Sequence, residues 1–142
     1  MSDNKPSHNR YRAHQILVKK AKLTSIQKYP KQLRLHDRHV GKFLPLIFIK
    51  RVLKGEIKIW DWSKFIIAIN SKGMADLYGY FSAHNILVHI EAEAKTGNAR
   101  QTKEQQAWQK HIESLGGLYI LFHTEEEFIN QLENYLISRK LI

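Results

Sequence analysis

The sequence predicts one α/β domain in which a mixed central sheet is flanked by helices. The chain has 142 residues, about the length of one domain, and 43% of them are hydrophobic, enough for a core of normal size. Segments with the β-branched and aromatic composition of strands fill the middle of the chain. The order strand, helix, strand, helix near its end predicts helices on both faces of the sheet.

Residues 1–55 are predicted to form a basic, mostly helical N-terminal extension. Within it, residues 1–9 are expected to be a disordered arm. Residues 10–28 are expected to be a basic helix with a sparse apolar side, which consists of Ile16, Leu17, Ala21 and Leu23.

Two further segments complete this extension. Residues 29–42 are expected to form a loop, because they contain a proline, a glycine and the polar cluster HDRH. The spacing in that cluster matches no metal-binding motif. Residues 43–54 predict a short helix with Pro45 near its start, basic side chains in its last turn and Gly55 just after it.

Four segments that follow have the composition of strands. They are EIKIW (56–60), KFIIAIN (64–70), GMADLYGYF (73–81) and NILVHIEAEA (85–94). A short SAHN connection between the last two predicts a hairpin.

The C-terminal third predicts a crossover between parallel strands. Residues 102–115 have helical spacing, and residues 118–122 read as a short buried strand. Together with the strand at 85–94 they form a βαβ unit, which is expected to be right-handed. Thr124 is expected to cap a last helix, with Glu127 closing a capping box.

The charge is divided unevenly along the chain. Residues 1–54 hold 14 Lys or Arg and two acidic residues, a formal charge of +12, whereas residues 55–142 carry −2. A basic half is typical of a polyanion partner such as nucleic acid, although a role in solubility alone stays open. The cations expected to contact nucleic acid are Arg10, Arg12, Lys19, Lys20, Lys22, Arg100 and Lys103, the last two with solvated loop charges as an open alternative.

The composition argues against several classes of protein. The chain has no cysteine, so it has no disulfide framework and no cysteine-based zinc site. Its first residues lack the apolar region of a secretory signal, and the apolar run at 43–49 is too short to span a bilayer. We therefore expect an intracellular, cytoplasmic protein with no membrane partner.

The segment HIEAEAK carries charge at every second position. His89, Glu91, Glu93 and Lys95 would line one face of a strand, because side chains in a strand alternate between faces. Buried carboxylates persist when they are paired, hydrogen-bonded or bound to a metal. An edge strand with one wet, charged face is the alternative reading of this pattern.

Asp76, Glu93, Lys95 and Gln105 follow one another in an order that suggests chemistry. Two carboxylates on adjacent strands can hold Mg²⁺, and Mn²⁺ is expected to substitute. A lysine two residues after the second carboxylate can orient an attacking water and stabilise charge on a phosphate. Gln105 faces the sheet, but it also completes a capping box with Thr102, and both readings can hold. This set predicts metal-assisted phosphodiester hydrolysis.

Glu91 is the ambiguous member of the charged face. It is left open as a further metal or water ligand, or as a neighbour of Lys58 or Lys64. Glu93 is preferred as the ligand, because it lies next to the loop that follows the strand.

At these residues the chain resembles the PD-(D/E)XK nuclease superfamily, and within it the small VRR-NUC type. The pattern of that type runs roughly Gly-x-x-Asp-Leu-x-Gly, Ile-Glu-x-Lys, Gln-x-x-aromatic and Gly-Gly. Here it reads GMADLYG (73–79), EAEAK (91–95), QQAW (105–108) and GG (116–117). The resemblance covers about residues 60–137, and its motifs are specific in combination.

The resemblance implies a restriction-endonuclease-like α/β/α core over residues 56–142 and a Mg²⁺-dependent endonuclease that hydrolyses DNA. It is compatible with a structure-specific enzyme and with a homodimer, as in relatives that cut junctions. It also implies a bacterial or phage-encoded protein.

The resemblance also implies roles for single residues. Asp76, Glu93 and the backbone carbonyl of Ala94 would be metal ligands, Lys95 the catalytic base or stabiliser, and Gln105 a supporting residue. Many relatives add a glutamate from the first helix, and residues 4–55 contain only Asp37 as an acidic residue.

Two other functions stay open from the sequence. One is a nucleic-acid-binding module of nuclease-like fold with slow or absent cleavage. The other is a structural or accessory protein of a phage or mobile element, in which the charged strand is a plain wet face.

Overall fold

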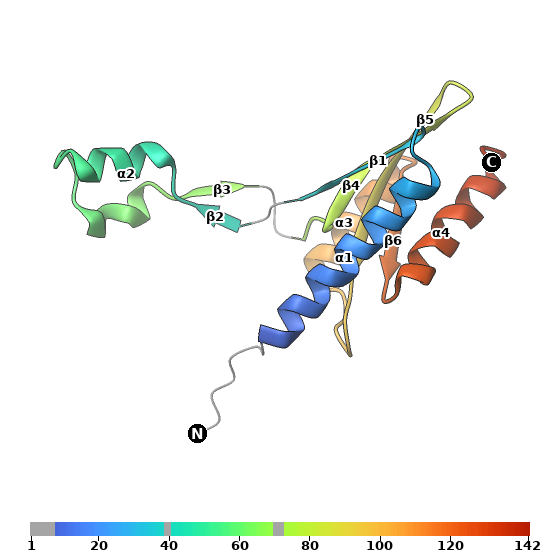
Figure 1. The fold of residues 1–142 in the computed structure, drawn as a ribbon, viewed down its shortest axis with the longest axis horizontal. Coiled ribbons are helices and arrows are strands. Elements are labelled where there is room, and N and C mark those ends of the chain that lie inside the picture. Colours follow the sequence, from blue (N-terminus) through green and yellow to red (C-terminus); the bar gives the residue numbers. More distant parts are fainter. Residues whose placement is uncertain (1–7, 39–40, 70–72) are drawn as a thin grey trace.

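The structure is a computed structural model that describes residues 8–38, 41–69 and 73–142. Its centre is a four-stranded mixed sheet with the order β1-β4-β5-β6 (Figure 1). The antiparallel part pairs β1 with β4 and β4 with β5, while β5 and β6 are parallel. The strands are β1 (Leu33–Asp37), β4 (Leu77–Ala83), β5 (Ile86–Ala94) and β6 (Leu118–Phe122).

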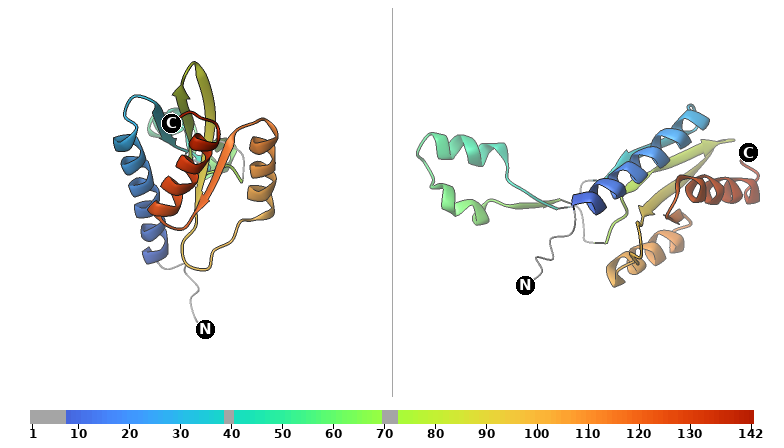
Figure 2. Two further views of the ribbon diagram at one scale, coloured as in Figure 1. Left: turned by 90° about the vertical axis from the view of Figure 1, so that its right-hand side faces the viewer. Right: turned by 60° about the horizontal axis from the view of Figure 1, so that its bottom comes forward.

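Helices cover both faces of this sheet, as predicted (Figure 2). On one face lie α1 (His8–Lys28) and α4 (Glu125–Ser138), and on the other lies α3 (Lys103–Ser114). The main core fills the space beneath α1 and α4, and its largest buried side chains include Phe81, Phe122, Phe128, Leu132 and Leu136. The predicted mixed α/β class is therefore confirmed.

The alternation of side chains along β5 separates an apolar face from a charged one. Ile90, Ala92 and Ala94 are buried in the main core. Glu91 and Glu93 point to the face covered by α3 and are 1% and 3% exposed. The strand is therefore an interior strand with two buried carboxylates, and the reading as a wet edge strand is wrong.

Two backbone features fix the pairing of β4. His84 and Asn85 join it to β5 in a two-residue turn with φ of 52° and 62°, which suits the twist of a tight hairpin. Gly79 faces β1 so closely that an added Cβ would lie 1.8 Å from the carbonyl oxygen of Arg34. A glycine is required at this position because the backbone of β1 occupies the space of a side chain.

The loop predicted for residues 29–42 is wrong for residues 33–37 and 41–42, which lie in strands. Residues 33–37 form β1, in which Leu33 and Leu35 alternate into the core while Arg34 stays exposed. This edge strand completes the sheet. Its backbone pairing with β4 stabilises the strand although most of its neighbours in the sequence are polar. Together with α1 it shares the main core with the C-terminal elements.

The chain leaves the sheet after β1 and forms an arm of α-helical, 3-10-helical and strand segments (Figure 1). The Arg38 N–H donates to the Asp76 carbonyl at 2.8 Å, so the chain departs and returns at neighbouring positions. The arm consists of β2 (Gly41–Phe43), α2 (Leu46–Leu53), η1 (Ile59–Lys64) and β3 (Ile67–Ile69), with β2 and β3 paired antiparallel.

The arm confirms one expected helix and part of one expected strand, and it corrects another expected strand. The helix predicted at 43–54 is α2. The strand predicted for EIKIW is wrong, because β2 and β3 already pair with each other and η1 begins at Ile59. The segment KFIIAIN contributes β3 to this separate pair and adds no strand to the central sheet.

The helix predicted at 10–28 is α1, and part of its expected apolar side faces the core. Ala21 is buried and Leu17 packs against the core, whereas Ile16 and Leu23 are 44% and 58% exposed. Docking on the sheet therefore buries Val18, which the sequence pattern did not include, in place of Ile16 and Leu23. Of the disordered N-terminal segment expected at residues 1–9, residues 1–7 lie outside the described residues, and α1 begins at His8.

The cap of α4 is also partly different from the prediction. Thr124 accepts a hydrogen bond from the Glu127 N–H, as expected. The Glu127 carboxylate accepts from the N–H of His123, one residue before the cap, so the box does not close on Thr124. Within the described ranges, no helix is long and apolar enough to cross a membrane.

Candidate active site

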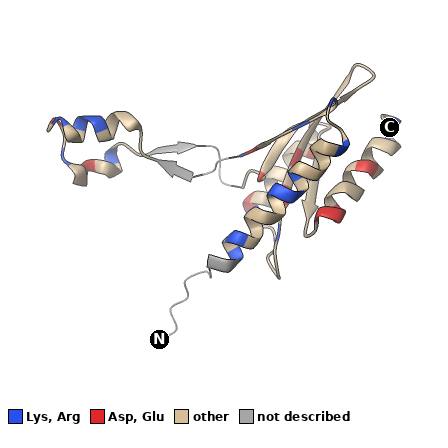
Figure 3. Cartoon of the chain, viewed as in Figure 1, with Lys and Arg blue, Asp and Glu red and all other residues tan. Residues whose placement is uncertain are grey.

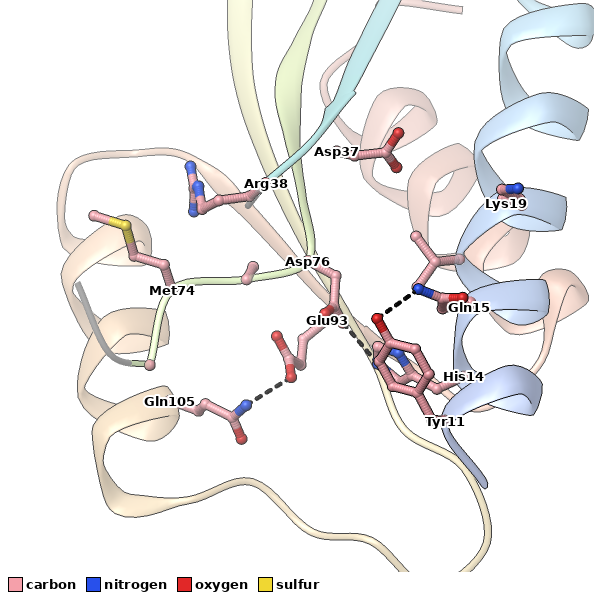
Figure 4. A pocket seen from close by; sticks show the side chains of 13 residues that line it. Tyr11, His14, Gln15, Lys19, Asp37, Arg38, Met74, Asp76, Glu93 and Gln105 are labelled. Atoms are coloured by element: carbon pink, nitrogen blue, oxygen red, sulfur yellow. Dashed lines mark hydrogen bonds and ion pairs between the residues drawn. The ribbon is translucent and has the colours of Figure 1, made fainter. Parts of the chain in front are cut away.

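A cavity of about 710 Å³ opens beside the charged end of β5 (Figure 4). The segment that leads into β4 contributes Asp76, β5 contributes Glu93, and the first turn of α3 contributes Gln105. From the opposite side, α1 contributes Tyr11, His14, Gln15, Val18 and Lys19. The carboxylates and the glutamine that the sequence singled out therefore lie together at one cavity.

Glu93 is buried with one carboxylate oxygen unsatisfied. Its Oε1 accepts a hydrogen bond of 2.6 Å from Gln105, and Lys95 Nζ lies 3.3 Å away. Its Oε2 is buried and has no hydrogen-bond partner among the described residues. Burial and the neighbouring charge of Asp76 raise the pKa of Glu93 to about 7, although the lysine acts in the opposite direction.

Gln105 holds the lysine and the glutamate in place. Its Oε1 accepts from Lys95 Nζ at 2.7 Å and from the backbone N–H of Thr102 at 2.9 Å. The Thr102 hydroxyl accepts from the Gln105 N–H, so the capping box is complete. Gln105 therefore completes the N-cap of α3 and also contacts Glu93 and Lys95, because the cap orients its amide toward them.

Asp76 lies where the cavity meets α1. Its Oδ2 accepts the Ala94 N–H at 2.8 Å, which ties the entry to β4 to the end of β5. The same oxygen lies 3.2 Å from Nε2 of His14, and this nitrogen is also 3.2 Å from the Ala94 carbonyl oxygen. The hydrogen bond to Asp76 raises the pKa of His14 above its usual range.

Glu91 is occupied by other contacts. Arg38 donates to both of its oxygens, at 2.5 and 2.9 Å, and Trp108 Nε1 donates at 2.8 Å. His89 Nε2 lies 3.1 Å from Oε1. Burial alone would raise the pKa of Glu91, but these contacts hold it below its usual range. The cation that pairs with Glu91 is thus Arg38, which follows β1 directly, and not Lys58 or Lys64, which the sequence had left open.

The basic residues predicted to contact nucleic acid lie at different distances from the cavity. Lys19 lines it, and Lys22 donates to Asp37 at 2.9 Å near its edge. The others are exposed side chains on α1, in the loop before α3 and at its start, namely Arg10, Arg12, Lys20, Arg100 and Lys103. Figure 3 shows that the basic residues gather on α1 and on the arm.

Sequence reasoning missed His14, Arg38 and Tyr11. Tyr11 lies at the cavity and accepts a hydrogen bond from the Gln15 side chain at 2.8 Å. The spacing of Tyr11, Gln15 and Lys19 along one side of a helix is visible in the sequence, but the partner of that side is not.

The donor set fits a hard divalent cation in type, although it is not a preformed cage. Carboxylate and carbonyl oxygens are the ligands that Mg²⁺ prefers, and Glu93 Oε2 is an oxygen without a partner of its own. Across the described residues, no group of three or more His, Cys, Asp or Glu side chains is already arranged to hold a metal ion. To complete a coordination shell, the Glu93 side chain would have to move toward the cation, and a backbone oxygen would have to serve as a further ligand.

Comparisons of the chain with models of protein families, with curated proteins and with solved structures found no match.

Proposed function

We propose that the protein is a divalent-cation-dependent endonuclease that hydrolyses DNA phosphodiester bonds on a restriction-endonuclease-like fold. The observation that carries this proposal is the buried carboxylate of Glu93, which has one unsatisfied oxygen beside Asp76 and a lysine beside the other. Leaving a buried charged oxygen unpaired is unfavourable, which is typical of a site that awaits a ligand.

Each residue of the site would have its own role in the reaction. Asp76, Glu93 and the Ala94 carbonyl would hold Mg²⁺ or Mn²⁺. When bound, the cation supplies positive charge that stabilises the transition state and eases deprotonation of the attacking water. Lys95, held by Gln105, would orient that water and stabilise the charge that develops on the phosphate.

A nucleic-acid substrate is supported by basic side chains at the cavity and along α1, and the choice of DNA rests on the resemblance to nucleases. Lys19 lines the cavity, and exposed Arg10, Arg12 and Lys20 lie on the same helix. These side chains would contact phosphates and position the strand without reading its sequence. Preference for branched DNA and assembly as a homodimer belong to this proposal through the resemblance alone.

The test is cleavage of supercoiled plasmid and of labelled linear and branched duplexes with Mg²⁺, Mn²⁺ or EDTA. Wild type is expected to cut only with a cation, and Lys95→Ala is expected to lower the rate about 100-fold or more. Lys110→Ala serves as control, because this exposed lysine lies on α3 outside the residues that line the cavity. Cutting that persists in EDTA, or that survives Lys95→Ala unchanged, would refute the proposal.

A second candidate function is nucleic-acid binding without cleavage. It is favoured by the contact of His14 with Asp76 and Ala94, since an imidazole N–H would occupy oxygens that a cation needs. In that case both wild type and Lys95→Ala would bind DNA in a salt-dependent way and cut none of the substrates.

A further inference from the structure

His14 reaches the candidate cation site from an element far away in the sequence. It lies on α1, and its Nε2 is 3.2 Å from both Asp76 Oδ2 and the Ala94 carbonyl oxygen. These are two of the three atoms assigned above to the cation. The imidazole is partly exposed, with 31% of its side-chain surface accessible, and it lines the cavity.

We propose that His14 is a nitrogen ligand of the cation, and that the site therefore prefers Mn²⁺ to Mg²⁺. The proposal rests on the cation-dependent function above and names the ion that this function would use. It also assigns α1 a direct part in the site beside its contacts with DNA.

The distances fit neighbouring corners of one coordination shell. Two ligands that bind an octahedral ion at about 2.1 Å and at right angles lie about 3 Å apart. The separations of His14 Nε2 from the aspartate and carbonyl oxygens are close to this value. In the neutral tautomer that is protonated on Nδ1, Nε2 carries the lone pair that a ligand needs.

The surroundings of His14 favour a ligand role over a purely structural one. Val18 and Ala21, one and two turns further along α1, are packed in the core, so the helix presents the imidazole from a fixed position. Glu91, the other candidate for an additional ligand, is held by Arg38 and Trp108. Among the candidates raised from the sequence and the structure, His14 is therefore the one that lies against the ligand atoms.

A nitrogen ligand changes which ion the site selects. Mg²⁺ strongly prefers oxygen ligands, whereas imidazole is a good ligand for transition metals. Mn²⁺ accepts carboxylate and carbonyl oxygens and also binds nitrogen. A shell with two carboxylates, one carbonyl and one imidazole would thus bind Mn²⁺ more tightly than Mg²⁺.

The test measures binding of the two cations, without DNA and without cleavage. Mn²⁺ affinity is taken from the electron paramagnetic resonance signal of free Mn²⁺, and Mg²⁺ affinity from competition. His14→Ala is expected to weaken Mn²⁺ binding about tenfold or more, with a smaller effect on Mg²⁺. His14→Glu, which supplies an oxygen instead, is expected to shift the preference toward Mg²⁺, while His111→Ala on α3 leaves both affinities unchanged.

A measurement on the wild type keeps the test valid if a variant fails to fold. In protein with ¹⁵N-labelled histidine rings, pulsed electron paramagnetic resonance spectra of bound Mn²⁺ are expected to show coupling to one ring nitrogen. Absence of this coupling, or Mn²⁺ binding that His14→Ala leaves unchanged or tightens, would overturn the role of His14. If Asp76→Ala then still abolishes binding, the proposed function stands. If wild type binds neither cation, both proposals fail.

Discussion

Glu93 combines burial with an incomplete set of hydrogen bonds, and this makes it sensitive to pH. Its pKa is about 7 in the folded chain, against an ordinary value of 4.5. A carboxyl group whose pKa is raised by folding destabilises the protein as the pH rises through that interval. The raised pKa of His14 acts in the same direction, since stability gained by the protonated imidazole is lost as the pH rises.

In EDTA, the wild type is expected to lose about 2 kcal/mol of unfolding free energy between pH 5.5 and pH 8. Glu93→Gln should remove most of this loss and be more stable than wild type at pH 8, because the amide carries no charge. Urea unfolding at several pH values measures the free energy of unfolding of both proteins. Glu126→Gln, at an exposed position of α4, is the control. A wild-type stability that is flat or rises over this range would contradict the prediction.

Arg38 and Glu91 form a buried ion pair on the same face of β5. Their side chains are 8% and 2% exposed, and Arg38 also lies over the ring of Tyr78 at 4.6 Å. Removing one partner of such a pair leaves a buried charge without compensation, which costs far more than the pair contributes.

Arg38→Met is expected to lower the unfolding free energy by about 3–5 kcal/mol. Adding Glu91→Gln should recover part of the loss, because the carboxylate charge is then absent while Trp108 keeps an acceptor. Arg139→Met, at an exposed position after α4, is the matched control in the same urea titrations. A cost below about 1 kcal/mol for Arg38→Met would show that the pair is dispensable.

The sequence could predict the members of the site that lie close together along the chain. Asp76, Glu93, Lys95 and Gln105 come from adjacent elements, and alternation in β5 together with the N-cap of α3 fixes their directions. His14 could not be found in this way, since its contact with Asp76 joins residues 62 positions apart. Only the docking of α1 decides which of its polar side chains reaches the cavity.

At the scale of elements, strong local patterns were predictable and an edge strand was not. The crossover from β5 through α3 to β6 has two strands with apolar cores, a capping box at the start of α3 and two glycines after its end. In contrast, β1 has only Leu33 and Leu35 as a period-two signal, set among charged residues and preceded by a proline. An edge strand with one solvated face needs few apolar residues, so its pattern resembles that of a loop.

The close approach of β1 to β4 gives a prediction at this scale. Gly79→Ala is expected to cost about 3 kcal/mol or more, because the new methyl group would overlap the Arg34 carbonyl and force the strands apart. Hydrogen exchange should show faster exchange of the β1 amides, alongside a lower melting temperature. Ser82→Ala, at an exposed position of the same strand, should change neither. Unaltered protection of β1 in Gly79→Ala would refute this explanation.

At the scale of the molecule, the arm lies outside the four-stranded sheet and has a strand pair of its own. Its helices pack on each other through Phe48 and Phe65, whose ring centroids are 5.0 Å apart. Much of its remaining surface is apolar and exposed, including Leu44, Leu46, Ile47, Leu53, Ile59, Trp60 and Trp62. Since Phe43 and Ile67 are paired across β2 and β3, a two-residue turn could replace everything between them.

Replacement of residues 44–66 by Asn-Gly is expected to leave the four-stranded sheet folded, with an unfolding free energy within about 1 kcal/mol of wild type. Circular dichroism and urea unfolding measure this outcome. Removal of residues 1–28 is the contrasting variant and should unfold the chain, because Val18 and Ala21 belong to the main core. An unfolded arm-deleted protein would show that the arm supports the sheet.

The position of α1 also determines when the cavity can exist during synthesis. This helix leaves the ribosome before β4, β5 and α3, and the loops that close between them are long. The wall formed by Tyr11, His14 and Lys19 is therefore complete only after the sheet has been assembled and the helix has docked on it. A cation that binds there would select finished chains over nascent or misfolded ones and would stabilise them by mass action.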